Sequence, residues 1–159
     1  MSAPRVRETI NNCVSRSQSD SYEDQQKALQ TLASITRVSR QYRSLLAQTD
    51  GAVSTLLGLS KSSSPVVIQT LSPSILLNLS LNPDLKQSLA SMETIYRLNS
   101  IIQSSSSQET VKLASSLICS LAMLDKNKAR FGVAGTVQVL VKAVSVPSNP
   151  AGHHLLSSL

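Results

Sequence analysis

Apolar residues recur along most of the chain at the three- and four-residue intervals of amphipathic helices. The most regular stretches align with one another: ALQTLASIT at 28–36, SPSILLNLS at 72–80, ASSLICSLA at 114–122 and a shorter HLLSSL at 154–159. When Ile35, Leu79, Leu121 and Leu159 are taken as equivalent, successive copies lie 44, 42 and 38 residues apart. A period of about 40–47 residues is typical of solenoids built from helical repeats. The pattern therefore predicts a repeat array.

The residues that follow each copy also recur. About ten residues later comes an apolar anchor, which is Leu45, Leu89 or Phe131. A second amphipathic segment then occupies 49–59, 92–102 or 133–144, and Ser- and Pro-rich loops follow at 61–65, 104–108 and 146–150. Each repeat is thus predicted to hold a short, a medium and a long helix. Such a unit cannot bury its apolar face alone and must stack on its neighbours.

The long helices contain three sets of equivalent core positions. Two sets are large and apolar: Leu32, Leu76 and Ile118, then Ile35, Leu79 and Leu121. The third set is small and would let helices approach closely: Ala28, Ser72 and Ala114. Pro73 interrupts this pattern, because proline in a helix interior removes a hydrogen bond. It either kinks the helix or lies in the first turn of a shortened helix capped by Ser72.

Composition supports an all-α fold. Aromatic residues make up 3% of the chain and there are five Gly, while runs that alternate in the manner of strands are few. We expect residues 1–21 to be an N-terminal extension and 22–159 to be the repeat array. The approximate repeats are 22–64, 65–107, 108–149 and a partial 150–159.

One line of each long helix stays polar at four-residue spacing, which places its members on one helix face. This polar strip holds Gln26, Gln30 and Ser34 on the first long helix, Thr70, Ser74 and Asn78 on the second, Lys112, Ser116 and Ser120 on the third, and His154 and Ser158 on the partial fourth. Stacked helices would bring these rows side by side, and solenoids bind extended partners along such surfaces. The alternative is a face that is merely solvated. Asn78 is the most informative member, because aliphatic residues surround it in ILLNLSL.

The formal charge of +6 raises the question of nucleic acid or acidic lipid as a partner. Most cations are scattered singly, but two trios occur: Arg37, Arg40 and Arg43, then Lys126, Lys128 and Arg130. Neither trio is interleaved with stacking aromatic residues, as single-strand binders usually require. Solubility and attraction to acidic protein partners are therefore favoured, and nucleic-acid binding is less favoured.

The sequence shows no arrangement of residues that predicts catalysis. His153 and His154 are adjacent and would point in different directions on a helix, so we expect no metal site and no cofactor. Cys13 and Cys119 lack CxxC spacing and predict neither a disulfide framework nor a zinc site. No signal peptide or membrane span is indicated, and we expect the protein to be cytoplasmic, nuclear or both.

Two segments resemble the armadillo-repeat consensus. ILLNLSLNPDLKQSL at 75–89 resembles its first part, and LAMLDKNKARFGVAGTVQVLVKAV at 121–144 resembles its second part. Lys126, Asn127 and Lys128 fit the N-K element, while Ala134 and Gly135 fit the A-G element. The resemblance covers roughly 22–159 and is greatest to the armadillo regions of plant U-box ubiquitin ligases and their relatives that lack a U-box.

The resemblance implies a right-handed α-solenoid of about three armadillo repeats and a partial fourth, with a groove lined by each third helix. Asn78 matches the family's groove asparagine, and Ser34, Ser120 and Ser158 replace it in the other repeats. The family's aromatic residue one turn earlier is absent, and Gln30, Ser74, Ser116 and His154 stand there instead. That departure disfavours importin-like recognition of basic peptides.

The leading hypothesis is a protein-interaction scaffold, not an enzyme, that resembles the substrate-recognition region of a U-box ligase. The residues ahead of the first repeat are too few for a U-box, so this chain would supply substrate recognition alone. A stand-alone armadillo adaptor unrelated to ubiquitin is the alternative, and a basic nucleic-acid-binding array is a third hypothesis.

Overall fold

The structure is a computed structural model that describes residues 3–144 of the 159-residue chain, and in these residues every regular element is helical. The elements follow one another as α1 (Ala3–Ser17), α2 (Tyr22–Val38), α3 (Arg40–Gln48), α4 (Ala52–Leu59), α5 (Val66–Leu79), the 3-10 turn η1 (Pro83–Leu85), α6 (Lys86–Leu89), α7 (Met92–Ser104), α8 (Gln108–Ala122), α9 (Asp125–Val133) and α10 (Thr136–Val144). The predicted loop at 146–150 and the predicted partial repeat at 150–159 lie outside the described residues.

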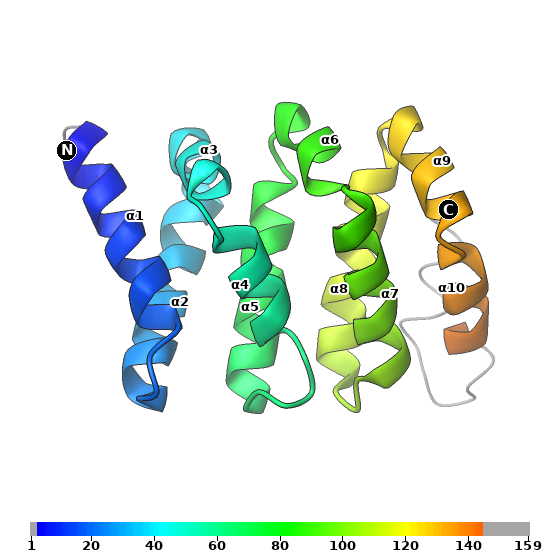
Figure 1. Ribbon diagram of the computed structural model, residues 1–159, viewed down its shortest axis with the longest axis horizontal. Coiled ribbons are helices and arrows are strands. Elements are labelled where there is room, and N and C mark those ends of the chain that lie inside the picture. Colours follow the sequence, from blue (N-terminus) through cyan, green and yellow to red (C-terminus); the bar gives the residue numbers. More distant parts are fainter. Residues whose placement is uncertain (1–2, 145–159) are drawn as a thin grey trace.

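The helices form an elongated stack of two layers (Figure 1). The long helices α2, α5 and α8 lie side by side in one layer, with α5 packed against both of the others. The medium helices α1, α4, α7 and α10 make the second layer, and the short elements α3, η1–α6 and α9 run along one edge. Three elements recur as α3–α4–α5 and as η1–α6, α7, α8, and the third is the longest in each set. The predicted short, medium, long order holds in the second set, whereas α3 with nine residues is longer than α4 with eight.

Helix α1 lies within residues 1–21, which the sequence predicts to be an N-terminal extension, and it packs against the first long helix, α2. Residues Ala3–Ser17 form α1, which packs on α2 through Val6, Ile10, Cys13 and Val14. The remaining described side chains of α1 are polar and exposed apart from the buried Ser17 and the exposed Pro4. The part of α1 that does not pack against α2 is therefore mostly polar and exposed.

Serine residues cap the N-termini of helices α2, α3, α7 and α8. Ser21, Ser39, Ser91 and Ser107 each accept a hydrogen bond from a backbone N–H in the first turn that follows. These N-caps satisfy N–H groups that have no partner inside the helix. Gly51 and Gly135 precede the medium helices α4 and α10 with φ of +76° and +75°. Glycine adopts this left-handed conformation without strain because it has no Cβ. The two similar φ values show that the same turn precedes α4 and, two repeats later, α10.

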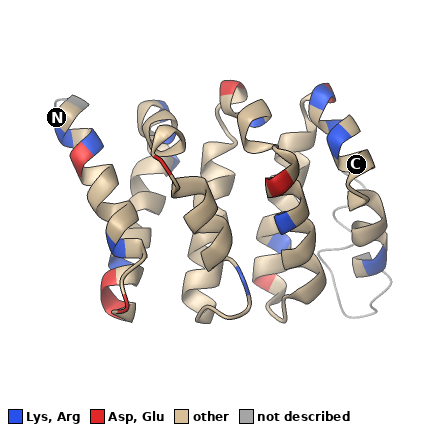
Figure 2. Ribbon diagram, in the orientation of Figure 1, with Lys and Arg blue, Asp and Glu red and all other residues tan. Residues whose placement is uncertain are grey.

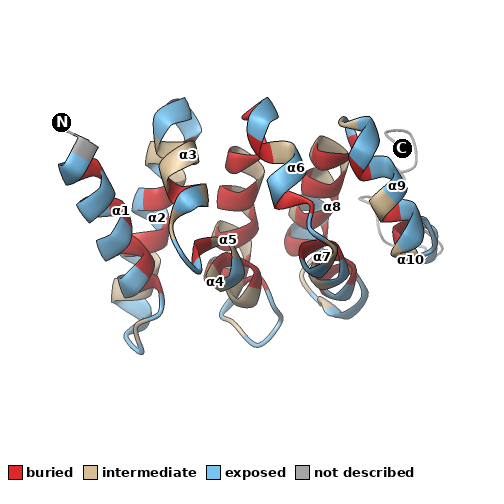
Figure 3. Ribbon diagram, turned by 45° about the horizontal axis from the view of Figure 1, so that its top comes forward, coloured by how far each residue is buried: buried red, intermediate tan, exposed pale blue. Residues whose placement is uncertain are grey.

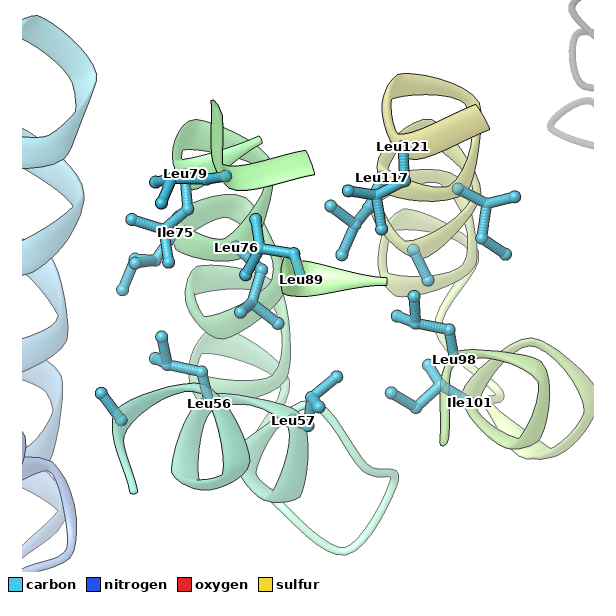
Figure 4. Close-up of a cluster of buried hydrophobic side chains, with 14 of the residues drawn as sticks. Leu56, Leu57, Ile75, Leu76, Leu79, Leu89, Leu98, Ile101, Leu117 and Leu121 are labelled. Atoms are coloured by element: carbon cyan, nitrogen blue, oxygen red, sulfur yellow. The ribbon is translucent and has the colours of Figure 1, made fainter. Parts of the chain in front are cut away.

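The predicted core positions are confirmed. Leu32, Leu76 and Ile118 are 1%, 2% and 0% exposed, and the small set Ala28, Ser72 and Ala114 is buried as well. Leu79 and Leu121 are fully buried, whereas Ile35 is only half-buried. Figure 4 shows aliphatic side chains of α4, α5, α7 and α8 filling the space between the layers. Buried residues occur on helices along the stack and cover much of α5 and α8 in its middle (Figure 3).

Pro73 lies inside α5, so the alternative of a helix that begins at Ser72 is wrong. Proline has no N–H, and the carbonyl of Gln69 one turn earlier therefore loses its helical donor. Thr110 of α8 takes over this role, because its Oγ1 lies 3.3 Å from Gln69 O and 3.3 Å from Gln69 Oε1 and can donate to either. Thr110 is fully buried. The neighbouring repeat thus compensates for the proline.

This compensation predicts a coupling between Thr110 and Pro73. Thr110→Val removes the donor and leaves a buried carbonyl unsatisfied, which is expected to lower the free energy of unfolding by about 1–3 kcal/mol. In a Pro73→Ala background the new N–H can bond Gln69 O, and the same change is expected to cost less. Urea unfolding of the four proteins of this double-mutant cycle measures the difference. Equal costs in the two backgrounds would contradict the assignment.

Candidate binding surface

Eight residues of the predicted polar strip, Gln30 to Ser120, lie on the long helices α2, α5 and α8, as does Gln26, while His154 and Ser158 lie outside the described residues. Gln30, Ser34 and Lys112 are exposed, and the other five are half-buried. Gln30 and Ser34 line a hollow of about 530 Å³ between α1 and α2, together with Cys13 and Arg16. Their side chains, and that of Ser116, make no hydrogen bond within residues 3–144. These three residues are therefore available to a ligand.

Asn78 is engaged within the array. Its Nδ2 donates to Ala33 O at 3.2 Å and to Thr36 Oγ1 at 3.1 Å, which are both in the last turns of α2. Both N–H groups of the amide are used, and they join α5 to its neighbour. A substitution at Asn78 therefore affects the packing of the layer before it affects any partner.

Ser120 occupies the corresponding place on α8 and is also engaged. Its Oγ lies 2.7 Å from Ser80 Oγ at the end of α5, and it accepts a hydrogen bond from Lys86 Nζ at 2.8 Å. Thr70 and Ser74 donate instead to carbonyls of their own helix, Val67 O and Leu71 O. The strip thus contains residues that join two helices, residues bonded within their own helix, and residues whose side chains make no hydrogen bond among the described residues.

Arg43 has a role that the sequence did not reveal. Its Nε donates to Thr36 O at 2.6 Å and its Nη2 to Arg37 O at 2.7 Å, which satisfies two carbonyls at the end of α2. Its Nη1 donates to Asn82 Oδ1 in the next repeat at 3.1 Å. A cation at a helix C-terminus is favoured by the helix dipole. Arg43, a member of the first basic trio, therefore joins two neighbouring repeats through hydrogen bonds, and we call a cation with this role a clasp.

Lys86 makes the equivalent clasp one repeat later. Its Nζ donates to Ser80 O at 2.7 Å and to Ser120 O at 2.9 Å, and so it bridges the ends of α5 and α8. Burial lowers the pKa of the Lys86 ammonium below its ordinary value, because desolvation disfavours the charged form. In the second trio, Arg130 donates to Ala90 O at 2.9 Å and to Gln87 O at 3.2 Å. Arg43, Lys86 and Arg130 thus donate hydrogen bonds to backbone carbonyls of the array.

The two cysteines lie in different surroundings. Cys13 is buried between α1 and α2, and burial raises the pKa of its thiol more than the nearby Arg16 guanidinium lowers it. Cys119 is half-buried and lines a cavity of about 270 Å³. That cavity is bounded by Ile118, Ala122, Met123, Lys128, Phe131, Thr136 and Val137. A raised pKa makes Cys13 a poor nucleophile, so its role is packing.

Residues 3–144 contain neither a candidate metal site nor a helix that could span a membrane. No group of three His, Cys, Asp or Glu side chains there could hold a metal ion. No helix in that part of the chain is long and apolar enough to cross a bilayer. The pair His153 and His154 lies outside the described residues.

Solved structures share this arrangement of helices. A designed armadillo repeat protein superposes on the chain with a TM-score of 0.75 at 19% sequence identity, over 99% of this chain and 64% of that protein. The fold is that of an armadillo-repeat solenoid. Two engineered proteins solved by the Northeast Structural Genomics Consortium match this armadillo fold with TM-scores of 0.79 and 0.77, at 16% and 19% identity. Each of these two matches covers 94% of this chain.

The match is one of fold alone at these identities. The chain spans 62% and 61% of the lengths of the two engineered proteins, which is less than two thirds. No protein-family model and no curated protein matches the sequence. The comparisons therefore support the armadillo architecture and do not bear on the plant U-box ligases in particular.

Proposed function

We propose that this armadillo array is a protein-interaction scaffold that binds an extended segment of a partner protein across α2, α5 and α8. The observation that supports this function best is the free outer face of the long-helix layer. Gln30, Ser34 and Ser116 point polar groups from it that no other described residue uses. A stacked layer of this kind offers the same chemical groups at regular intervals, which suits an extended chain.

The finer proposal is that the partner is a substrate of a ubiquitin ligase. Its support is the resemblance of segments 75–89 and 121–144 to the armadillo regions of plant U-box ligases and their relatives without a U-box. A ubiquitination assay on the longest natural product of the gene tests it. Ubiquitin transfer to a captured partner is the expected result. A product that binds the partner but transfers no ubiquitin would support the stand-alone adaptor instead.

The binding face can be tested without knowing the partner. Linear peptides are selected from a display library on the 159-residue chain, and their affinities are then measured for two variants. Ser116→Arg and Gln30→Arg each place a long cation on the long-helix layer without removing a hydrogen bond. Each is expected to weaken binding at least about tenfold, because a bulky charge in an interface clashes and must be desolvated.

Two matched controls carry the same new side chain on the opposite layer. Ser100→Arg on α7 and Gln138→Arg on α10 alter exposed residues there. Binding to both control proteins should stay close to that of the unaltered chain. If the control variants lose affinity while Ser116→Arg and Gln30→Arg do not, the long-helix layer is not the binding face.

A further inference from the structure

Positive charge is concentrated on one edge of the armadillo array. We define the short-helix edge as residues 37–48, 81–90 and 123–133. These ranges begin at or just after the C-terminal ends of α2, α5 and α8, and they contain the short elements α3, η1–α6 and α9. Seven of the chain's 15 Lys and Arg lie there, and two of its nine Asp and Glu. Seven minus two leaves a net +5 on this edge, out of the chain's net +6. Figure 2 shows some of these cations along α9 and α6.

The same edge exposes a large apolar side chain at the end of each long helix, and Val133 at the end of α9 is a further one. Val38, Leu81 and Met123 are 81%, 54% and 75% exposed, and each lies at the end of α2, α5 or α8. They are 43 and 42 residues apart, so successive repeats contribute one each. Single exposed apolar residues need no explanation, but a row with the period of the array presents a continuous feature to a partner.

A row of cations runs in register with this apolar row. Arg43, Lys86 and Lys128 each follow the exposed apolar residue of their repeat by five positions. Arg43 and Lys86 contact carbonyls of the helix ends that carry Val38 and Leu81. Lys128 and Met123 line the same cavity of about 270 Å³. Apolar and cationic groups are therefore neighbours in all three repeats.

These cations lack strong anionic partners of their own. Lys86 Nζ bonds only neutral oxygens, Ser80 O, Ser120 O and Ser120 Oγ, among the described residues. Burial lowers its pKa, so an approaching carboxylate would relieve an unfavourable charge. The ion pair of Lys128 with Asp125, at 3.5 Å, is exposed and contributes little. The edge keeps an uncompensated positive field.

We propose that the short-helix edge binds an acidic segment of a partner protein that carries regularly spaced apolar residues. The proposal rests on the scaffold function and adds the partner's chemistry. Stacked helices lie about 8–10 Å apart, and a chain in the polyproline II conformation advances about 3.1 Å per residue with three residues per turn, which places every third side chain on one side. One repeat therefore corresponds to about three residues of the partner. Apolar side chains at every third position would contact Val38, Leu81 and Met123, with carboxylates between them facing the cations.

The residue types on this edge favour a peptide over a membrane or a nucleic acid. The exposed row is aliphatic, whereas proteins that lie on bilayers usually place aromatic side chains at the interface. Phe131 is buried and Tyr42 is half-buried, and the structure describes every residue of this edge. Neither aromatic ring is therefore available for stacking on bases.

A designed probe tests the proposal directly. The probe is a fluorescent peptide of four Glu-Asp-Leu triplets, and its binding to the 159-residue chain is followed by anisotropy. Binding is expected, and it should weaken as salt increases, because charged groups drive part of it. A peptide of four Glu-Asp-Ser triplets and one of four Lys-Lys-Leu triplets should each bind at least about tenfold more weakly.

Variants of the edge complete the test. Leu81→Ser and Lys128→Glu alter exposed side chains and are each expected to weaken binding of the Glu-Asp-Leu peptide at least about tenfold. Val66→Ser and Lys61→Glu make the same changes at exposed positions away from the edge and should leave binding unchanged. Thermal melts by circular dichroism check that all four proteins stay folded.

Several results would overturn the assignment. Equal binding of the Glu-Asp-Ser peptide would exclude the apolar row, and equal loss in the control variants would exclude the edge. Tighter, edge-dependent binding of phosphatidylserine vesicles or of single-stranded DNA would replace the acidic peptide as ligand. If display-selected ligands still depend on Ser116 and Gln30 while the Glu-Asp-Leu peptide does not bind, this inference fails and the scaffold function stands.

Discussion

Replacing Ile10 by Asp is expected to detach α1 from the array. Ile10 is fully buried in α1, which packs against α2, and it belongs to the apolar core. An unpaired buried charge, added to the loss of an aliphatic side chain, costs about 3–5 kcal/mol. The loss should appear as a lower melting temperature and as fast hydrogen exchange in α1. Exchange in α2 should rise as well, since Leu29 and Leu32 would lose their cover.

The matched control for this substitution is Asn11→Asp. It adds the same charge at the next position, which is exposed. Its effect on the free energy of unfolding should stay within about 0.5 kcal/mol. If Ile10→Asp and Asn11→Asp behave alike, α1 is not packed as the structure shows, and residues 1–21 form an extension in the simple sense.

Leu76→Ala is expected to produce a second large effect, at the centre of the array. Leu76 is 2% exposed and belongs to the cluster of buried aliphatic side chains drawn in Figure 4. Removing its three outer carbons costs transfer free energy and leaves a cavity, for a loss of about 2–5 kcal/mol. Urea unfolding followed by circular dichroism measures it.

Leu81→Ala provides the comparison within the same segment. Leu81 has the same side chain but is 54% exposed, so its truncation should change the free energy of unfolding by about 0.5 kcal/mol or less. Equal losses for the two leucines would mean that the burial pattern of α5 is wrong. The contrast also separates stability from binding, because Leu81 belongs to the short-helix edge and Leu76 does not.

The period of the sequence predicted the layer of long helices correctly, because a helical repeat leaves its signal in every copy. Leu32, Leu76 and Ile118 could be assigned to the core on this basis, and all three are buried. Helix α1 carries no copy of that pattern. Its buried residues, Val6, Ile10, Cys13 and Val14, have helical spacing, but the residues between them are polar. The packing of this segment against α2 becomes visible only in the structure.

The candidate binding surface was harder to predict. Contacts between repeats decide which of its polar side chains are already hydrogen-bonded and which are not. Asn78 was singled out from the aliphatic residues around it, yet its amide donates to Ala33 and Thr36. Those acceptors are 45 and 42 residues away in the chain. The roles of Arg43 and Lys86 as clasps depend on helix ends brought close by stacking. A single sequence gives the residue types of such contacts and not their partners.

Hydrogen–deuterium exchange of the chain with and without a display-selected peptide tests the central claim most directly. The scaffold account predicts slower exchange on binding in α2, α5 and α8, with the ends of these helices included. It predicts little change in α4, α7 and the described part of α10. Protection confined to the medium helices, with α2, α5 and α8 unchanged, would contradict the account.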